Sequence, residues 1–201
     1  MVNLVLPIFI VIPLYAFLGI SIKFIDQAYD EDMYSLKTAN VLAVMSGIFM
    51  GILMVYDSPF STAFFLAMIV SLVLARKIDN VAFAAGTGAA MITLVIMMFR
   101  VDVQFLWGIV VVFLVAGFID EIMDGVAHRL KMFTPMDWFL HYRPFSDIAI
   151  VLLVLTGTFS WIYLAPYFAF TFGYIMMQRF TTMEIGSSIK GVLLRAVNLR
   201  R

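Results

Sequence analysis

FIDQAYD (residues 24–30) recurs as FIDEIMD (residues 118–124), and each copy closes an apolar run long enough to cross a bilayer. Extended to residues 24–37 and 118–131, the two segments share Phe, Ile, Asp, Asp, Leu and Lys at aligned positions. We call the two copies the FIDxxxD motifs. They predict two clusters of carboxylates, each at the end of a membrane helix.

The composition places the chain in a membrane. Of its 201 residues, 64% are hydrophobic and only 13% are charged, and the mean hydropathy is +1.04. This is too little polar surface to cover a soluble globule, so we expect an all-α integral membrane protein, multi-pass in the cell membrane. The net charge of zero gives no reason to expect nucleic acid as a partner, and the absence of Cys excludes disulfides and thiolate metal sites.

The apolar runs predict seven transmembrane helices, with six as the alternative. Residues 147–180 form one unbroken apolar stretch that would overrun a bilayer. We expect it to divide at Ala165-Pro166, because proline disfavours a helix that continues through it. The predicted spans cover residues 4–23, 38–56, 60–76, 80–99, 103–119, 147–162 and 165–180.

The basic residues favour seven spans and orient them. With seven spans, every Lys and Arg except Arg100 falls on one side of the membrane, whereas six spans would move the basic tail to the opposite side from the basic loops. The positive-inside rule makes the basic side cytoplasmic, with the N-terminus outside and the C-terminus in the cytoplasm. Within a single transmembrane domain (1–180), residues 4–76 and 103–180 then form a hypothetical 3+1+3 parallel repeat around helix 80–99.

The negative charges of the acids in the two motifs need to be compensated by cations. Asp26 and Asp30 are four residues apart, as are Asp120 and Asp124, so the two carboxylates of each pair repel each other. Each pair also lies at a C-terminal helix end, where the macrodipole disfavours anions. Neighbouring Lys and Arg side chains can supply the compensation as interfacial ion pairs. The alternative is a Mg²⁺ ion held by carboxylates from two helices, with a substrate phosphate as a further ligand. On that interpretation the catalytic residues are Asp26, Asp30, Asp120 and Asp124, and Glu121 joins them as a metal ligand.

The loop after the second motif supplies candidates for substrate binding. Residues 135–144 begin and end with proline, and they predict a short interfacial helix that could cover a site. An aromatic anchor in the interface is the other interpretation of this segment. The candidate substrate-binding residues around it are His128, Arg129, Lys131 and His141.

Two family resemblances follow from these residues. The run from Glu121 to Arg129, with Asp124, Gly125 and His128, resembles the opening of the CDP-alcohol phosphotransferase signature DxxDGxxAR, with Glu for the first Asp and His for Ala. The second half of that signature, GxxxDxxxD, does not follow at its spacing. Paired acidic motifs at cytoplasmic helix ends are also similar to those of intramembrane prenyltransferases, which are larger and carry an Asn-Asp-rich motif absent here. Neither resemblance covers as much as a tenth of the chain, so we assign neither family.

Two further patterns concern packing and anchoring. The small residues of 84–90 and of 156–158 predict close helix approach. Residues 181–201 place apolar side chains on one helical side and carry Lys190, Arg195, Arg200 and Arg201. They predict an amphipathic basic tail on anionic lipid headgroups, with a partner-binding helix as the alternative.

Three functions remain compatible with the sequence. The first is a metal-dependent enzyme that acts on a lipid or isoprenoid phosphate at the cytoplasmic face, with Mg²⁺ as the cofactor. The second is a small transporter or channel, resembling in outline the seven-span sugar uniporters. The third is a non-catalytic subunit or lipid-binding scaffold in a homo-oligomer or membrane complex. The position of the carboxylates at an interface, rather than at the midplane where transporters bind their substrates, favours the enzyme.

Overall fold

A computed structural model describes residues 6–130 and 144–198, apart from the side chains of 124, 127–130 and 182–198. In this part the chain is all-α, and each predicted span corresponds to one α-helix. The elements are α1 (Ile8–Asp30), α2 (Leu36–Tyr56), α3 (Pro59–Leu74), α4 (Val81–Met98), α5 (Trp107–Leu130), α7 (Pro144–Leu155), the 3-10 turn η1 (Trp161–Tyr163) and α8 (Leu164–Asn198).

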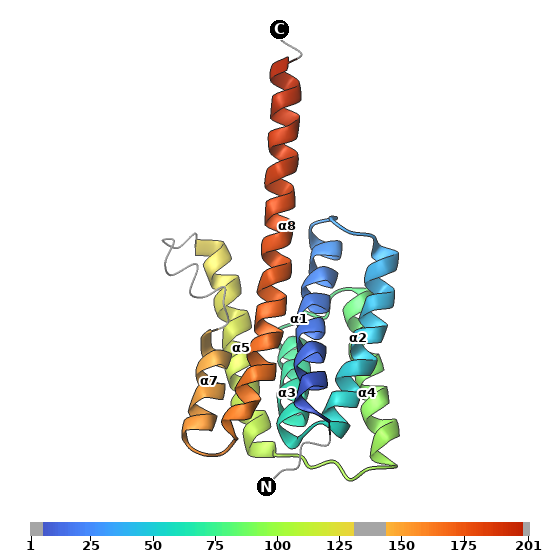
Figure 1. The fold of residues 1–201 in the computed structure, drawn as a ribbon, viewed down its shortest axis with the longest axis vertical. Coiled ribbons are helices and arrows are strands. Elements are labelled where there is room, and N and C mark those ends of the chain that lie inside the picture. The colour runs from blue at the N-terminus through green and yellow to red at the C-terminus, as the bar shows by residue number, and fades with distance from the viewer. Residues whose placement is uncertain (1–5, 131–143, 199–201) are drawn as a thin grey trace.

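Three of these helices, α1, α2 and α4, are long and apolar enough to cross a membrane, whereas α3 and α7 are shorter apolar helices. This indicates a multi-pass membrane protein. The helices form an up-and-down bundle in which α1 and α5 run in the same direction (Figure 1). Both FIDxxxD motifs therefore lie at one end of the bundle, which we call the motif end.

The chain divides between α7 and α8 at a different place from the one predicted. α7 ends at Leu155, and Gly157 follows with φ at +72°, a left-handed conformation that glycine adopts without steric cost. Pro166 lies in the first turn of α8, where backbone N–H groups have no partner within the helix, so proline is tolerated there. The break predicted at Ala165-Pro166 is wrong. The close packing predicted for 156–158 is also wrong, because these residues are exposed and a Cβ atom on Gly157 would meet no described atom within 4 Å.

Glycines bring two pairs of helices into backbone contact. A Cβ atom on Gly19 of α1 would lie 2.0 Å from the carbonyl oxygen of Phe170 in α8, and one on Gly173 would lie 2.4 Å from that of Ala16. α2 and α4 meet in the same way, since a Cβ on Gly47 would lie 2.1 Å from the oxygen of Gly86. The close approach predicted for 84–90 is thus confirmed.

The centre of the bundle is aromatic and is built around α3. Ser58 caps this helix and Pro59 occupies its first turn, so α3 begins abruptly after α2. Phe60 and Phe64 are buried, and Phe64 meets Tyr167 of α8 edge-on at 5.4 Å between ring centroids. Such pairs stabilise a core beyond the area they bury, so α3 fixes α8 against the rest of the bundle.

α8 continues without a break from the bundle through the segment predicted as a separate tail. In Figure 1 its C-terminal part projects past the other helices at the motif end. Thr181, the last residue of α8 whose side chain is described, is fully buried. It donates a hydrogen bond to Oε1 of Gln27 at 2.8 Å and lies 3.0 Å from the hydroxyl of Tyr34. These bonds hold α8 against the end of α1 at the place where α8 leaves the bundle. Binding of the tail to lipid headgroups stays a prediction.

Candidate functional site

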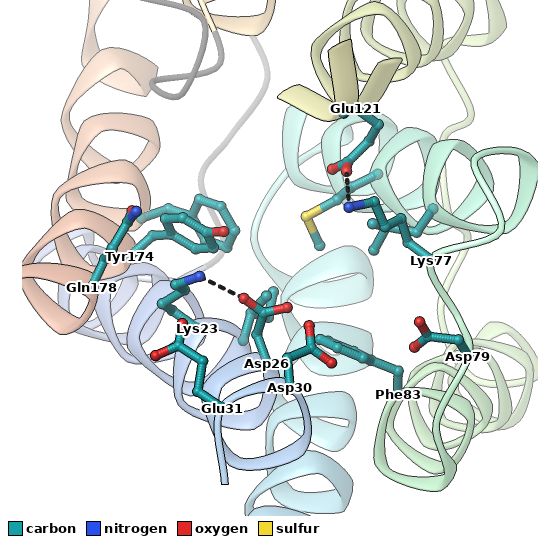
Figure 2. A pocket seen from close by; sticks show the side chains of 15 residues that line it. Lys23, Asp26, Asp30, Glu31, Lys77, Asp79, Phe83, Glu121, Tyr174 and Gln178 are labelled. Carbon is teal, nitrogen blue, oxygen red and sulfur yellow. Dashed lines mark hydrogen bonds and ion pairs between the residues drawn. The ribbon is translucent and has the colours of Figure 1, made fainter. Parts of the chain in front are cut away.

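A cavity of about 330 Å³ opens at the motif end, between α1, α3, α5, α8 and the start of α4. Its lining combines charged groups with an apolar surface formed by Ile22, Met68, Leu72, Phe83 and Phe170. Figure 2 shows acids from three separate segments of the chain around it. The charged and polar lining residues are Lys23, Asp26, Asp30, Glu31, Lys77, Asp79, Glu121, Tyr174 and Gln178.

The first motif contributes a lysine and two aspartates to the cavity. Nζ of Lys23 donates to Oδ2 of Asp26 at 2.5 Å, one helical turn away. The same ammonium lies 5.5 Å from the ring centroid of Tyr174 in α8, within the range of a cation–π contact. Lys23 is buried at 9% exposure, and it is held between an anion and a ring (Figure 2).

The second motif contributes Glu121 rather than its aspartates. The Glu121 side chain is 7% exposed, and its Oε2 lies 3.9 Å from Nζ of Lys77, which follows α3 (Figure 2). Gly125, one turn further along α5, also lines the cavity. One face of α5 therefore borders the same space as Asp26.

Asp30 and Asp79 complete the acidic rim. Asp30 is exposed, and it is repelled by Asp26 and Asp79 and attracted by Lys23 and Lys77. Among the described lining residues, the carboxylates are five and the lysines two. A cation or a cationic group would reduce the repulsion that this excess of negative charge produces.

Asp120, the counterpart of Asp26 in the second motif, has a different environment. It is 1% exposed, and its oxygens accept hydrogen bonds from the backbone N–H groups of Phe145 and Ser146 at 3.0 and 2.9 Å. The hydroxyl of Ser146 donates a third bond at 2.6 Å. Asp120 thus caps the N-terminus of α7 from α5, and it is not part of the cavity lining.

The structure brings together part of the predicted metal site. Asp26, Asp30 and Glu121 line one cavity, while Asp120 binds α7. Among the residues described, no three His, Asp or Glu side chains are grouped so that they could hold a metal ion by themselves. The side chains of Asp124, His128 and Arg129 and the whole of Lys131 and His141 lie outside the described part.

Several lining residues were not predicted as members of a site. Lys23 and Lys77 entered the prediction only among the basic residues that fall on one side of the membrane, and Asp79 was not a predicted site residue. Tyr174 and Gln178 were not considered, although they are spaced i,i+4 in the last predicted span and therefore share a helical face. That spacing of two polar groups near the end of an apolar run is the signal that could have identified them.

Comparison with protein-family models, with curated proteins and with solved structures gave no match. The functional argument therefore depends on the site itself rather than on a known family.

Proposed function

We propose that the protein is a Mg²⁺-dependent enzyme acting on a lipid or isoprenoid phosphate at the cytoplasmic face of the cell membrane. The observation that carries this proposal is the cavity at the motif end, where a charged rim stands above an apolar lining. Such a site matches an amphiphile whose headgroup is charged and whose chain is apolar.

The apolar part of the lining suits the hydrocarbon end of such a substrate. Ile22 and Leu72 come from α1 and α3, and Phe170 comes from α8, so a chain entering between them would meet three helices. At the rim, Lys23 and Lys77 are the described cations nearest to where a phosphate would lie. Each is now paired with a carboxylate, and a phosphate could exchange for that partner.

The acids suit a metal that arrives with the substrate. Mg²⁺ is usually bound through one or two carboxylates and substrate phosphates, and it keeps several waters. A preformed group of three protein ligands is therefore not required, in agreement with the arrangement of the described acids. We expect one or two of the candidates Asp26, Asp30 and Glu121 to be metal ligands on this basis, and Mg²⁺ would stabilise negative charge on the reacting phosphate.

Thermal unfolding in detergent tests the proposal directly. The melting temperature is measured with Mg²⁺ alone, with a farnesyl phosphate alone, with both, and with a chelator. We expect both together to stabilise the protein more than the sum of the separate effects, and we expect Asp26→Asn to remove that excess. Asp102→Asn, an exposed acid between α4 and α5, is the matched control.

A turnover assay then separates the enzyme from the other two functions. Release or transfer of phosphate that needs Mg²⁺ and Asp26 supports the enzyme. Synergistic stabilisation without turnover would instead indicate a lipid-binding scaffold. Absence of any effect of the phosphate, with or without Mg²⁺, would refute both and leave transport as the function to test.

The proposed orientation places the motif end in the cytoplasm, with seven spans. The seventh span is supported by the turn at Gly157, which separates α7 from α8 (Figure 1). Packing between helices supports the repeat. α1 packs against α8, and α3 packs against α5. If α1 corresponds to α5 and α3 corresponds to α8 in the repeat, each of these two contacts is the counterpart of the other.

Accessibility of tags in intact cells measures this topology. We expect a tag after Arg201 to be reachable only after the membrane is permeabilised and a tag before Met1 to be reachable from outside. Finding both tags on the same side would exclude seven spans and, with them, the repeat.

A further inference from the structure

A second buried acid lies at the opposite end of the bundle from the cavity. Asp57 occupies the short connection between α2 and α3 and is 1% exposed. Its Oδ2 accepts hydrogen bonds from the hydroxyls of Ser58, at 3.2 Å, and Ser61. Its Oδ1 is also buried, and it has no hydrogen-bond partner among the residues that the structure describes. One oxygen of this carboxylate is therefore saturated while the other is desolvated and uncompensated.

The groups around Asp57 are neutral oxygens from several elements. The hydroxyl of Tyr15, on α1, hydrogen-bonds to Ser61, and Tyr163, in η1, interacts with Ser58. All four are buried. The tyrosines are the titratable groups that face the carboxylate, and no basic side chain contributes to its electrostatics in the described part of the chain.

An anion in this position lacks the compensation that buried charges usually have. Buried carboxylates are normally paired with a cation, coordinated to a metal or protonated, because desolvation otherwise costs several kcal/mol. Burial raises the pKa of Asp57, and this exceeds the opposing effect of the hydrogen bonds from Ser61 and Ser58. A bound water could satisfy Oδ1 but would leave the charge in place. The missing component is one positive charge.

We propose that Asp57 anchors a binding site for a single monovalent cation, a proton or Na⁺, at the end of the bundle opposite the motif end. A proton would bind to Oδ1 and convert the carboxylate to a neutral acid, and Oδ2 would keep its hydroxyl donors. Na⁺ would take Oδ1 together with lone pairs of the surrounding hydroxyls, which are the hard oxygen ligands that such an ion prefers. The site is separate from the cavity and does not depend on the proposed enzyme activity.

Two titrations of the full chain in detergent distinguish the two ions. The first follows the melting temperature from pH 8 to pH 4.5 with N-methylglucamine as the only cation. The folded pKa of Asp57 lies above its ordinary value of 3.8, so the folded protein takes up a proton before the unfolded chain does. Stability should therefore rise as the pH falls through the folded pKa. The second titration adds NaCl at pH 8, with N-methylglucamine chloride at equal ionic strength as its control.

We expect one titration to raise the melting temperature of the wild type by on the order of 3 °C relative to Asp57→Asn. Asp102→Asn, an exposed acid near the same end of the bundle, should behave as the wild type. A response to acid identifies the proton, and a response to NaCl alone identifies Na⁺. If wild type and Asp57→Asn respond in parallel to both, the proposal is overturned.

Ser61→Ala provides an independent variant in case Asp57→Asn does not fold. It removes one donor from Oδ2, so the charged form of Asp57 loses a hydrogen bond and its neutralisation becomes more favourable. If the cation is a proton, the response to acid should then be larger than in the wild type; if it is Na⁺, the response to NaCl should be smaller, because the Ser61 hydroxyl is lost as a ligand. An unchanged response would contradict the proposal, because a cation at Oδ1 must sense the loss of charge compensation at Oδ2.

Discussion

The two FIDxxxD motifs begin with the same three residues, but the first aspartate of each motif has a different environment and different partners. Asp26 pairs with Lys23 at the rim of a cavity, whereas Asp120 is buried and binds the N-terminus of another helix. In the second motif it is Glu121, one residue later, that reaches the cavity. The motif therefore fixes the position of a carboxylate on a helix, and the neighbouring element decides what the carboxylate does.

The length of the following segment accounts for the difference. After the first motif, α1 ends at Asp30 and α2 begins at Leu36, so only a short connection follows Asp26. After the second motif, α5 continues to Leu130, and α7 begins only at Pro144. This longer separation in sequence allows α7 to begin beside Asp120. A helix N-terminus attracts an anion as strongly as many side-chain cations do.

The largest difference between the motifs should appear in stability. Asp120→Ala removes the acceptor of two backbone N–H groups and one hydroxyl, so we expect it to lower the free energy of unfolding by about 2–4 kcal/mol. Asp26→Ala should cost less than about 1 kcal/mol, because its salt bridge is partly exposed. Unfolding of the purified protein in detergent measures both. Equal losses for the two variants would show that the motifs are equivalent after all.

A conservative pair of substitutions sharpens the same comparison. Asp120→Asn keeps one oxygen acceptor for the N-terminus of α7 but loses the charge that the helix end attracts, so it should cost about 1–2 kcal/mol. Asp26→Asn should leave stability within about 1 kcal/mol while removing the combined effect of Mg²⁺ and phosphate. Melting curves with and without both ligands test the pair. The comparison fails if Asp120→Asn abolishes ligand binding and Asp26→Asn does not.

The smallest effect concerns the ion pair of the first motif. A double-mutant cycle with Lys23→Met and Asp26→Asn should give a coupling of about 0.5 kcal/mol in stability, because the Asp26 side chain is partly exposed at the cavity rim. The corresponding cycle for Lys77 and Glu121 should give less, since their charged atoms are 3.9 Å apart. Couplings several times larger would mean that these pairs stabilise the fold rather than prepare a ligand site.

The helices were predictable because apolar run length is set directly by the thickness of a bilayer. The boundary between α7 and α8 was not, because Pro166 is a stronger signal in a sequence than a single glycine, whose left-handed φ becomes apparent only in the structure. Likewise, the first motif drew attention to Asp26 and Asp30, which both line the cavity. The role of Asp120 depended on where α7 would begin, which the spacing of residues does not reveal.

The position of Asp57 in the chain explains why the sequence did not indicate a site at the end of the bundle opposite the motif end. It lies between two apolar runs, where an acid is usually a solvated loop residue. Only two residues separate α2 from α3, however, so this connection has little length with which to reach solvent. The hydroxyls that surround Asp57 come from distant parts of the sequence, Tyr15 and Tyr163 among them. A short connection that carries an acid is therefore the signal to look for.

The backbone contact between α1 and α8 has a consequence for biogenesis. Gly19 and Gly173 let the earliest and latest helices of the bundle touch, and Lys23 and Tyr174 face each other one turn beyond that contact. α2 and α4 can pair while synthesis is still under way, since they are close in the chain. The cavity, by contrast, lacks the wall formed by α8 until the ribosome has made that helix. Lys23 and Asp26 are thus synthesised well before the helix that completes the cavity around them.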